Sequence, residues 1–265
     1  MQLTVISGYC AVLFYLTGSV FQGISLTSNR DTHNKVLSFG LLAVLAHAVS
    51  AYGVIRTSSG YHFGLVEIST LITLSISFVV LISSLRKPLN NLFLGLFPLA
   101  IIAIVASLAL GSNYPPTPMS LGLASHVLIS ILAYSFITIA ALQAGFLAYQ
   151  NHQLKHAHAG GVLSKFPPLQ DMEALLFELL WVGQLLLSLG IGAGILFIDD
   201  FWGLDGVPHK TVFSILAWIV FAVLLWGRHQ RGWRGQTAIR GTLGGFALLI
   251  VGFYGSKIVL EFILS

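Results

Sequence analysis

Apolar residues fall into eight long runs along this chain, and short polar segments separate them. An α-helix needs about 20 apolar residues to cross a hydrocarbon core of about 30 Å. Each run is close to that length, and the separators carry the turn residues proline, glycine and asparagine. We therefore predict eight spanning helices, at Leu3–Ile24, Val36–Ile55, Leu65–Leu85, Leu92–Leu110, Leu121–Tyr149, Ala174–Ile198, Thr211–Trp226 and Ala238–Ile263.

The composition excludes a soluble globular protein of this size. Hydrophobic residues make up 56% of the 265 residues and charged residues only 8%, whereas soluble domains contain roughly 25% charged residues. No segment is polar enough to form a separate soluble module. The expected fold class is all-α, with a single polytopic transmembrane helix bundle over residues 1–265 in contact with membrane lipids.

The basic residues alternate between the two sides of this expected bundle. Only Arg56, Lys210 and Lys257 fall on one side. The other ten lie together on the opposite side: Arg30, Lys35, Arg86, Lys87, Lys155, Lys165, Arg228, Arg231, Arg234 and Arg240. The positive-inside rule makes the side with ten cations cytoplasmic, so both termini and the loop of residues 199–209 are expected outside.

This charge pattern also bears on partners and location. The net charge of +4 is accounted for by membrane topology, and we expect no nucleic-acid partner. The N-terminus lacks the basic region and cleavage site of a secretory signal peptide, so the first run is expected to be retained as a helix. The expected location is the inner (plasma) membrane, as a multi-pass protein.

Several chemistries are excluded by residues that the sequence lacks. Cys10 is the only cysteine, so the chain has neither a disulfide framework nor a Cys-x-x-Cys redox pair. It also contains no glycine-rich phosphate loop, no serine–histidine–aspartate candidate and no His-Glu-x-x-His metalloprotease motif. We assign no catalytic residue.

Ionisable residues within the predicted helices mark candidate functional positions, because they are expensive to place in hydrocarbon. His47 lies near the middle of the second run, His126 about one turn from the outer end of the fifth, and His209 at the start of the seventh. Lys257 and Glu261 are one turn apart near the end of the last run, and we expect them to pair and to extend towards the interface.

The outer side of the predicted bundle brings together residue types that suit haem. His62, His126 and His209 all lie at or near this side, and neutral imidazole is a good axial ligand for haem iron and for other transition metals. Phe201, Trp202 and Asp205, in the loop before His209, could pack on a porphyrin and shape its platform. We therefore predict a non-covalent, b-type haem with His126 and His209 as iron ligands. His47 is a further cofactor-binding candidate, as an inner relay site or a residue that steadies a helix contact.

The C-terminal half also resembles a known family. The resemblance starts at Trp202-Gly203-Leu204-Asp205 and Lys210, and it continues through the apolar run 215–225, Arg228, Gly232-Trp233-Arg234-Gly235 and Gly245-Phe246. These residues resemble the cytochrome c assembly family of the CcsA/CcmC type, with its HemX-like relatives, and most of all its small inner-membrane branch of the YpjD type. Ser125-His126-Val127 resembles the helix that carries the family's first outer histidine.

This resemblance, strongest over residues 121–265, implies that the outer loop presents haem and that outer histidines on flanking helices ligate it. It implies a role in cytochrome c assembly or haem homeostasis, with a cytochrome assembly protein or another inner-membrane protein as partner. Two small-residue pairs, Gly190 with Gly194 and Gly241 with Gly245, predict close helix packing.

Two other functions remain open from the sequence. The first is a transporter-like or accessory membrane subunit with a decayed haem site, in which His47, Glu67 and Glu178 would serve a substrate or proton path. The second is a scaffold for a partner membrane protein.

Overall fold

The computed structural model describes residues 2–28, 31–85, 89–110, 115–155, 166–197 and 208–258, without the side chains of residues 90, 208 and 209. Eight helices in these ranges are long and apolar enough to cross a membrane. The predicted all-α fold is therefore confirmed. The residues group into two compact units, one built mainly from residues 1–118 and one from residues 119–158 and 167–265. That the whole chain acts as one domain stays a prediction.

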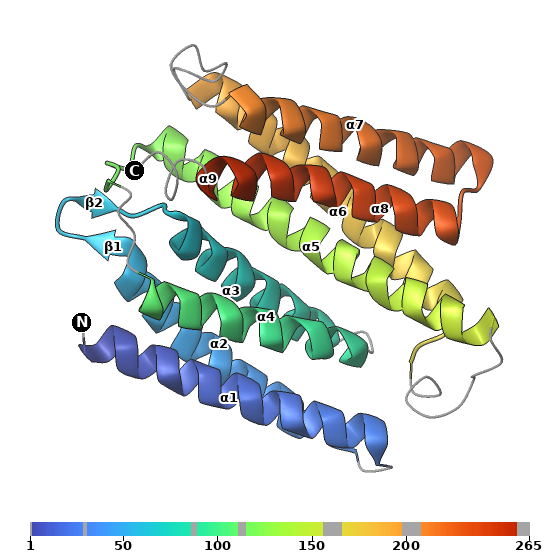
Figure 1. Ribbon diagram of the computed structural model, residues 1–265, viewed down its shortest axis with the longest axis horizontal. Helices are drawn as coiled ribbons and strands as arrows, with labels where there is room; N and C mark the ends of the chain where they lie inside the picture. Colours follow the sequence, from blue (N-terminus) through green and yellow to red (C-terminus); the bar gives the residue numbers. More distant parts are fainter. Residues whose placement is uncertain are drawn as a thin grey trace. The chain divides into compact units, whose positions relative to one another are not determined.

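Unit 1 is a four-helix bundle with a small hairpin. Its helices are α1 (Gln2–Thr27), α2 (His33–Ile55), α3 (Leu65–Ser84) and α4 (Asn90–Ala109). Each packs on the next, and α4 packs back on α1 (Figure 1). Strands β1 (Arg56–Thr57) and β2 (Gly60–Tyr61) pair antiparallel between α2 and α3. This hairpin was not predicted, because two-residue strands leave no alternation to detect.

Glycines allow the helices of unit 1 to approach closely. A Cβ atom added at Gly8 would lie 2.7 Å from Leu108 Cδ1, and one added at Gly18 would lie 2.8 Å from the Phe97 ring. In lipid, where every helix face is apolar, such close approach supplies the packing that hydrophobicity alone does not. The core between these helices holds large buried side chains, among them Tyr15, Ile76, Phe93 and Phe97.

Unit 2 repeats this arrangement with longer helices. Its helices are α5 (Leu121–Lys155), α6 (Leu169–Phe197), α7 (Pro208–Arg231) and α8 (Gln236–Ile250), and α8 continues through the π-helical segment η2 (Val251–Gly255) into α9 (Ser256–Ile258). Each helix again packs on the next, and α8 packs on α5. Successive helices run in opposite directions (Figure 1). The starts of α5 and α7 therefore share one end with α9, called here the His126 end, and the opposite end is called the Glu173 end.

Three glycines of the predicted small-residue pairs lie at close helix contacts of unit 2. A Cβ atom at Gly241 of α8 would lie 3.0 Å from Leu224 of α7, and Gly245 faces Phe221 of the same helix. At Gly190 of α6 a Cβ atom would lie 3.3 Å from Ser130 Oγ of α5.

The helices of unit 2 extend beyond the apolar runs that predicted them. Helix α5 continues to Lys155, α6 begins at Leu169 and α7 ends at Arg231. An apolar run marks the part of a helix that suits lipid. The hydrogen-bonded helix continues into polar residues that this pattern does not detect.

Candidate functional site

His126 is held by a backbone group of the neighbouring helix. It lies in the second turn of α5, half-buried, and its Nδ1 atom is 3.0 Å from the carbonyl oxygen of Gly190 in α6. A carbonyl oxygen can only accept a hydrogen bond, so Nδ1 is the nitrogen that carries the proton. The lone pair of the neutral ring is then on Nε2. In histidines that bind a metal, a hydrogen bond from the other ring nitrogen to a backbone carbonyl orients the ring in this way.

Gly190 has no side chain, and this allows α6 to come close enough to α5 for the hydrogen bond to form. A Cβ atom there would come within 3.3 Å of Ser130 Oγ and 3.8 Å of Ile129 Cγ2 on α5. Near the same end, a Cβ atom at Gly122 would lie 2.6 Å from the Phe197 ring. The first turns of α5 therefore pack tightly against the last turns of α6, and this packing fixes the orientation of the His126 ring.

A cation and an aromatic ring lie at the same end of unit 2. Lys210 lies in the first turn of α7, at the end of unit 2 where α5 also begins. Its ammonium group lies 5.2 Å from the centroid of the Phe253 ring in η2. In the sequence Lys210 served as a topology marker and as part of the family resemblance, and its place beside His209 was a signal that it borders the candidate site.

The π-helical turn brings further aromatic side chains to this region. The Tyr134 hydroxyl of α5 donates a hydrogen bond to the carbonyl oxygen of Leu249 at 3.0 Å, just before η2 begins. The Phe253 ring lies 5.4 Å from the Tyr134 ring and 5.2 Å from the Tyr254 ring. Single π-helical turns within α-helices are frequent at functional sites. Phe253 and Tyr254 were not singled out from the sequence.

Most of the other predicted haem-site residues lie outside the described ranges. This applies to Phe201, Trp202 and Asp205, and to the side chain of His209, whose backbone begins α7 next to Lys210. The pairing of His126 with His209 therefore stays a prediction. Among the residues that the structure describes, no group of three or more histidine, cysteine, aspartate or glutamate side chains could hold a metal ion.

His47 lies in unit 1, at the centre of α2, with none of its surface exposed. Its Nδ1 atom is 3.3 Å from the Tyr15 hydroxyl of α1, and the two rings meet edge to face at 5.9 Å. Its Nε2 atom has no hydrogen-bond partner within the described part of the chain. The side chain therefore joins α1 to α2, and a role in cofactor binding stays a prediction.

The remaining ionisable candidates have different surroundings. Glu67 is buried in the first turn of α3, whereas Glu178 of α6 is exposed. Lys257 is only 4% exposed, so the expectation that it extends to the interface is wrong. A π-helical turn holds more residues than an α-helical turn, and each added residue rotates the following positions by about 100° around the helix axis. Lys257 follows η2, so this rotation changes the face of the helix on which it lies. Its expected partner Glu261 lies outside the described residues.

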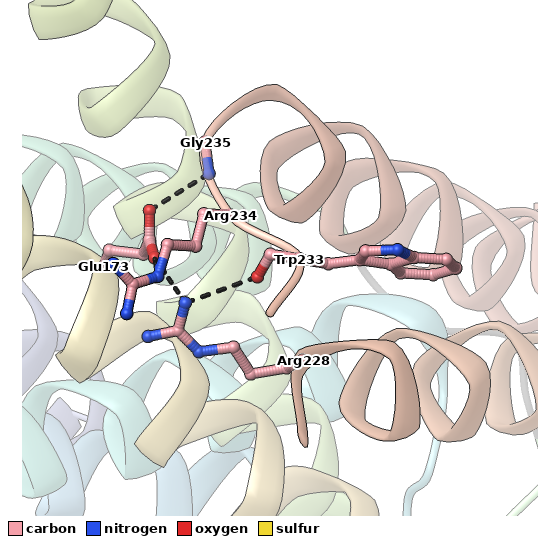
Figure 2. A network of polar contacts seen from close by, with 5 residues as sticks. All are labelled: Glu173, Arg228, Trp233, Arg234 and Gly235. Carbon is pink, nitrogen blue, oxygen red and sulfur yellow. Dashed lines mark hydrogen bonds and ion pairs between the residues drawn. The ribbon is translucent and has the colours of Figure 1, made fainter. Parts of the chain in front are cut away.

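A second polar network occupies the Glu173 end. One oxygen of the Glu173 carboxylate accepts a hydrogen bond from Arg228 of α7 at 2.8 Å, and the other accepts from the Gly235 backbone N–H at 3.0 Å (Figure 2). Arg228 also donates to the Trp233 carbonyl oxygen at 3.3 Å. This network fixes the turn between α7 and α8 onto α6. The opposite charges on one side of the predicted bundle could have indicated this pairing.

Comparisons with known proteins agree with the resemblance seen in the sequence. The family model described as cytochrome C assembly protein matches residues 36–264. The inner membrane protein YpjD of Escherichia coli (strain K12) is 29% identical over 248 residues, which cover 90% of this chain and 91% of YpjD. An uncharacterized 28.8 kDa protein of Azospirillum brasilense is 23% identical over the full length of both chains.

A more distant relative carries a functional name. The cytochrome c biogenesis protein CcsA of Prochlorococcus marinus (strain MIT 9515) is 23% identical over 169 residues, which cover 56% of this chain and 54% of CcsA. No solved structure matches the chain. With its eight spanning helices and its similarity to an inner-membrane protein, the chain is a multi-pass protein of the inner membrane.

Proposed function

The chain belongs to the cytochrome c assembly protein family, and on this premise we propose that it binds haem at the His126 end of unit 2 and serves cytochrome c assembly. The proposed role in assembly draws on the name of the CcsA relative. The proposed haem site draws on the residues around His126.

The observation that carries the proposal is the hydrogen bond from His126 Nδ1 to the Gly190 carbonyl oxygen, at 3.0 Å. It places the lone pair on Nε2 and holds the ring in one orientation. Neutral imidazole with Nδ1 bound to a backbone carbonyl is a common form of metal-ligating histidine. A histidine that served only as a polar side chain at the interface would not need its tautomer fixed.

The other residues of this end fit a porphyrin carrying acidic groups. Haem has an apolar, planar macrocycle with two propionates, and Lys210 offers a positive charge at the same end of unit 2 as His126. Phe253 and Tyr134 add aromatic surface next to that charge. In this proposal His126 binds the iron, Lys210 pairs with a propionate, and the aromatic side chains exclude water.

Haem would supply redox-active iron, and the chain would position it. His209 is the proposed second ligand, and Phe201, Trp202 and Asp205 are the proposed platform. The loop that carries these four residues precedes Lys210, so it leads directly to the described part of the site.

Haem titration of the full chain, purified in a mild detergent, tests the proposal. We expect the wild-type protein to develop a haem absorption band with saturable binding. Loss of an outer-shell partner alone weakens metal sites by about 10- to 100-fold, so His126→Ala is expected to weaken haem binding more than about 100-fold. His62→Ala is the matched control, because His62 is a half-buried loop histidine on the same predicted side. Equal binding by wild type and His126→Ala would reject the proposed site.

A further inference from the structure

The turn between α7 and α8 concentrates positive charge at the Glu173 end of unit 2. Residues 228–240 include four arginines and one histidine and contain no aspartate or glutamate. The positive-inside rule accounts for the sign of this charge, but the surroundings of the individual arginines differ.

One arginine has a structural role inside the network. Arg228 bonds to Glu173 at 2.8 Å with its side chain 26% exposed, and its guanidinium lies 4.7 Å from the Phe177 ring centroid. Gly235 N–H occupies the second oxygen of the same carboxylate. Figure 2 shows this arrangement, in which the Trp233 indole points away from the carboxylate. Arg228 is therefore the cation that Glu173 neutralises.

The remaining arginines of the turn are directed to the outside of the protein. Arg234 lies 3.8 Å from a Glu173 oxygen that already has a shorter bond to Arg228, and its side chain is 71% exposed. An exposed ion pair at this distance contributes little, because water screens it. Arg231 is exposed and lies 5.2 Å over the ring of Trp226, which is itself 52% exposed.

The surroundings of Arg231 and Arg234 are those of a membrane interface. Tryptophan side chains concentrate at the level of the lipid headgroups. Trp226 precedes Arg231 in the chain, and Trp233 lies between Arg231 and Arg234. The positive-inside pattern places this turn at the cytoplasmic leaflet, where anionic lipids attract basic residues with about 1 kcal/mol for each cation. Guanidinium groups also match the oxygens of a phosphate in geometry.

We propose that Arg231 and Arg234 form a binding site for the phosphate of an anionic phospholipid in the cytoplasmic leaflet. The Glu173–Arg228 network fixes the turn, and Trp226 and Trp233 lie against the acyl–headgroup boundary. This site is separate from the proposed haem site and does not depend on it.

Lipid titration of the full chain in a neutral detergent tests the site. Dioctanoyl phosphatidylglycerol is compared with dioctanoyl phosphatidylcholine, with the melting temperature and tryptophan fluorescence as readouts. We expect saturable binding of the anionic lipid only. The double variant Arg231→Gln, Arg234→Gln should bind it about 25-fold more weakly, from about fivefold for each cation removed.

Two further variants make the result specific. The double variant Arg231→Lys, Arg234→Lys keeps the charge and should keep the preference for the anionic lipid. The variant Arg56→Gln removes an exposed cation of the opposite predicted side and should behave as wild type.

Three results would overturn the proposal: equal binding of both lipids, an unchanged preference in the Arg231→Gln, Arg234→Gln variant, or a comparable loss in the Arg56→Gln variant. Inorganic phosphate that matches the lipid at equal concentration would show a site for free anions instead of lipid. If the glutamine substitutions removed a co-purifying acidic protein and left lipid binding unchanged, the partner would be a protein.

Discussion

Each of the two four-helix units contains a histidine on a spanning helix, and the two histidines have opposite environments. His47 is completely buried in unit 1 and meets the hydroxyl of Tyr15. His126 lies near the end of unit 2, half-buried, and meets the backbone carbonyl of Gly190. The helix order is alike in both units, so the difference comes from the depth of each histidine and from its partner.

The partner matters because it decides what the ring can do. A tyrosine hydroxyl can donate or accept a hydrogen bond, so it is compatible with either tautomer of His47. A carbonyl oxygen only accepts, so it allows one tautomer of His126 and leaves the lone pair of the neutral ring on Nε2. We infer that His47 mainly stabilises unit 1, whereas His126 mainly binds a ligand.

The largest difference between the two histidines should be seen in the stability of unit 1 when the partner of His47 is removed. Tyr15→Phe leaves the buried His47 without its hydroxyl partner, which should lower the free energy of unfolding by about 1–3 kcal/mol. The double variant Tyr15→Phe, His47→Leu removes both polar groups and should recover most of that loss. Thermal unfolding in detergent measures both, with Tyr9→Phe as the control, because Tyr9 lies on the same helix and is 60% exposed.

Haem binding by these unit 1 variants completes that comparison. We expect the variant Tyr15→Phe, His47→Leu to bind haem with wild-type affinity. Loss of the haem absorption band in this variant, with the fold retained, would place a haem ligand in unit 1. It would contradict the inference that His47 stabilises unit 1 and that His126 binds the ligand.

A smaller effect, on the affinity for haem, should show whether Lys210 contacts the propionates of haem or its ring. If Lys210 pairs with a propionate, Lys210→Met should weaken binding of haem about fivefold, the value of one cation near an anion. Binding of haem dimethyl ester, which lacks the negative charges, should not change. Lys210→Arg should preserve the difference between the two ligands. An equal loss of affinity for haem and for haem dimethyl ester would mean that Lys210 affects binding only by stabilising the fold.

The smallest effect should come from the carbonyl that orients His126. A methyl group at Gly190 would lie 3.3 Å from Ser130 Oγ, whereas one at Gly192 would meet nothing within 4 Å. Gly190→Ala should therefore shift α6 slightly from α5 and weaken haem binding severalfold, less than the roughly 10-fold minimum for full loss of an outer-shell partner. Gly192→Ala should bind as wild type. Identical affinities for the two alanine variants would show that the carbonyl does not position the ring.

The spanning helices could be predicted because bilayer thickness imposes a minimum apolar length on each of them. Their grouping into two bundles could not be predicted. In lipid all helix faces are apolar, and the contacts depend on small residues such as Gly8 and Gly245 whose partners the sequence does not identify.

The candidate site was only partly accessible to sequence reasoning. His126 could be found because a histidine in an apolar run is unusual. Gly190 could not be found as its partner, because a backbone acceptor on another helix depends on how both helices are rotated. Lys257 was placed wrongly because the π-helical turn before it changes the face that follows, and the apolar sequence Val251–Gly255 gives no sign of such a turn.

Rescue by imidazole tests most directly the claim that His126 is the ligand. His126→Gly removes the ring and leaves space for free imidazole, which can supply the same nitrogen to iron. We predict that His126→Gly loses the haem spectrum of the wild-type protein and that added imidazole restores it in a saturable manner, while His62→Gly keeps the spectrum without imidazole. A wild-type spectrum in His126→Gly without imidazole would contradict the account.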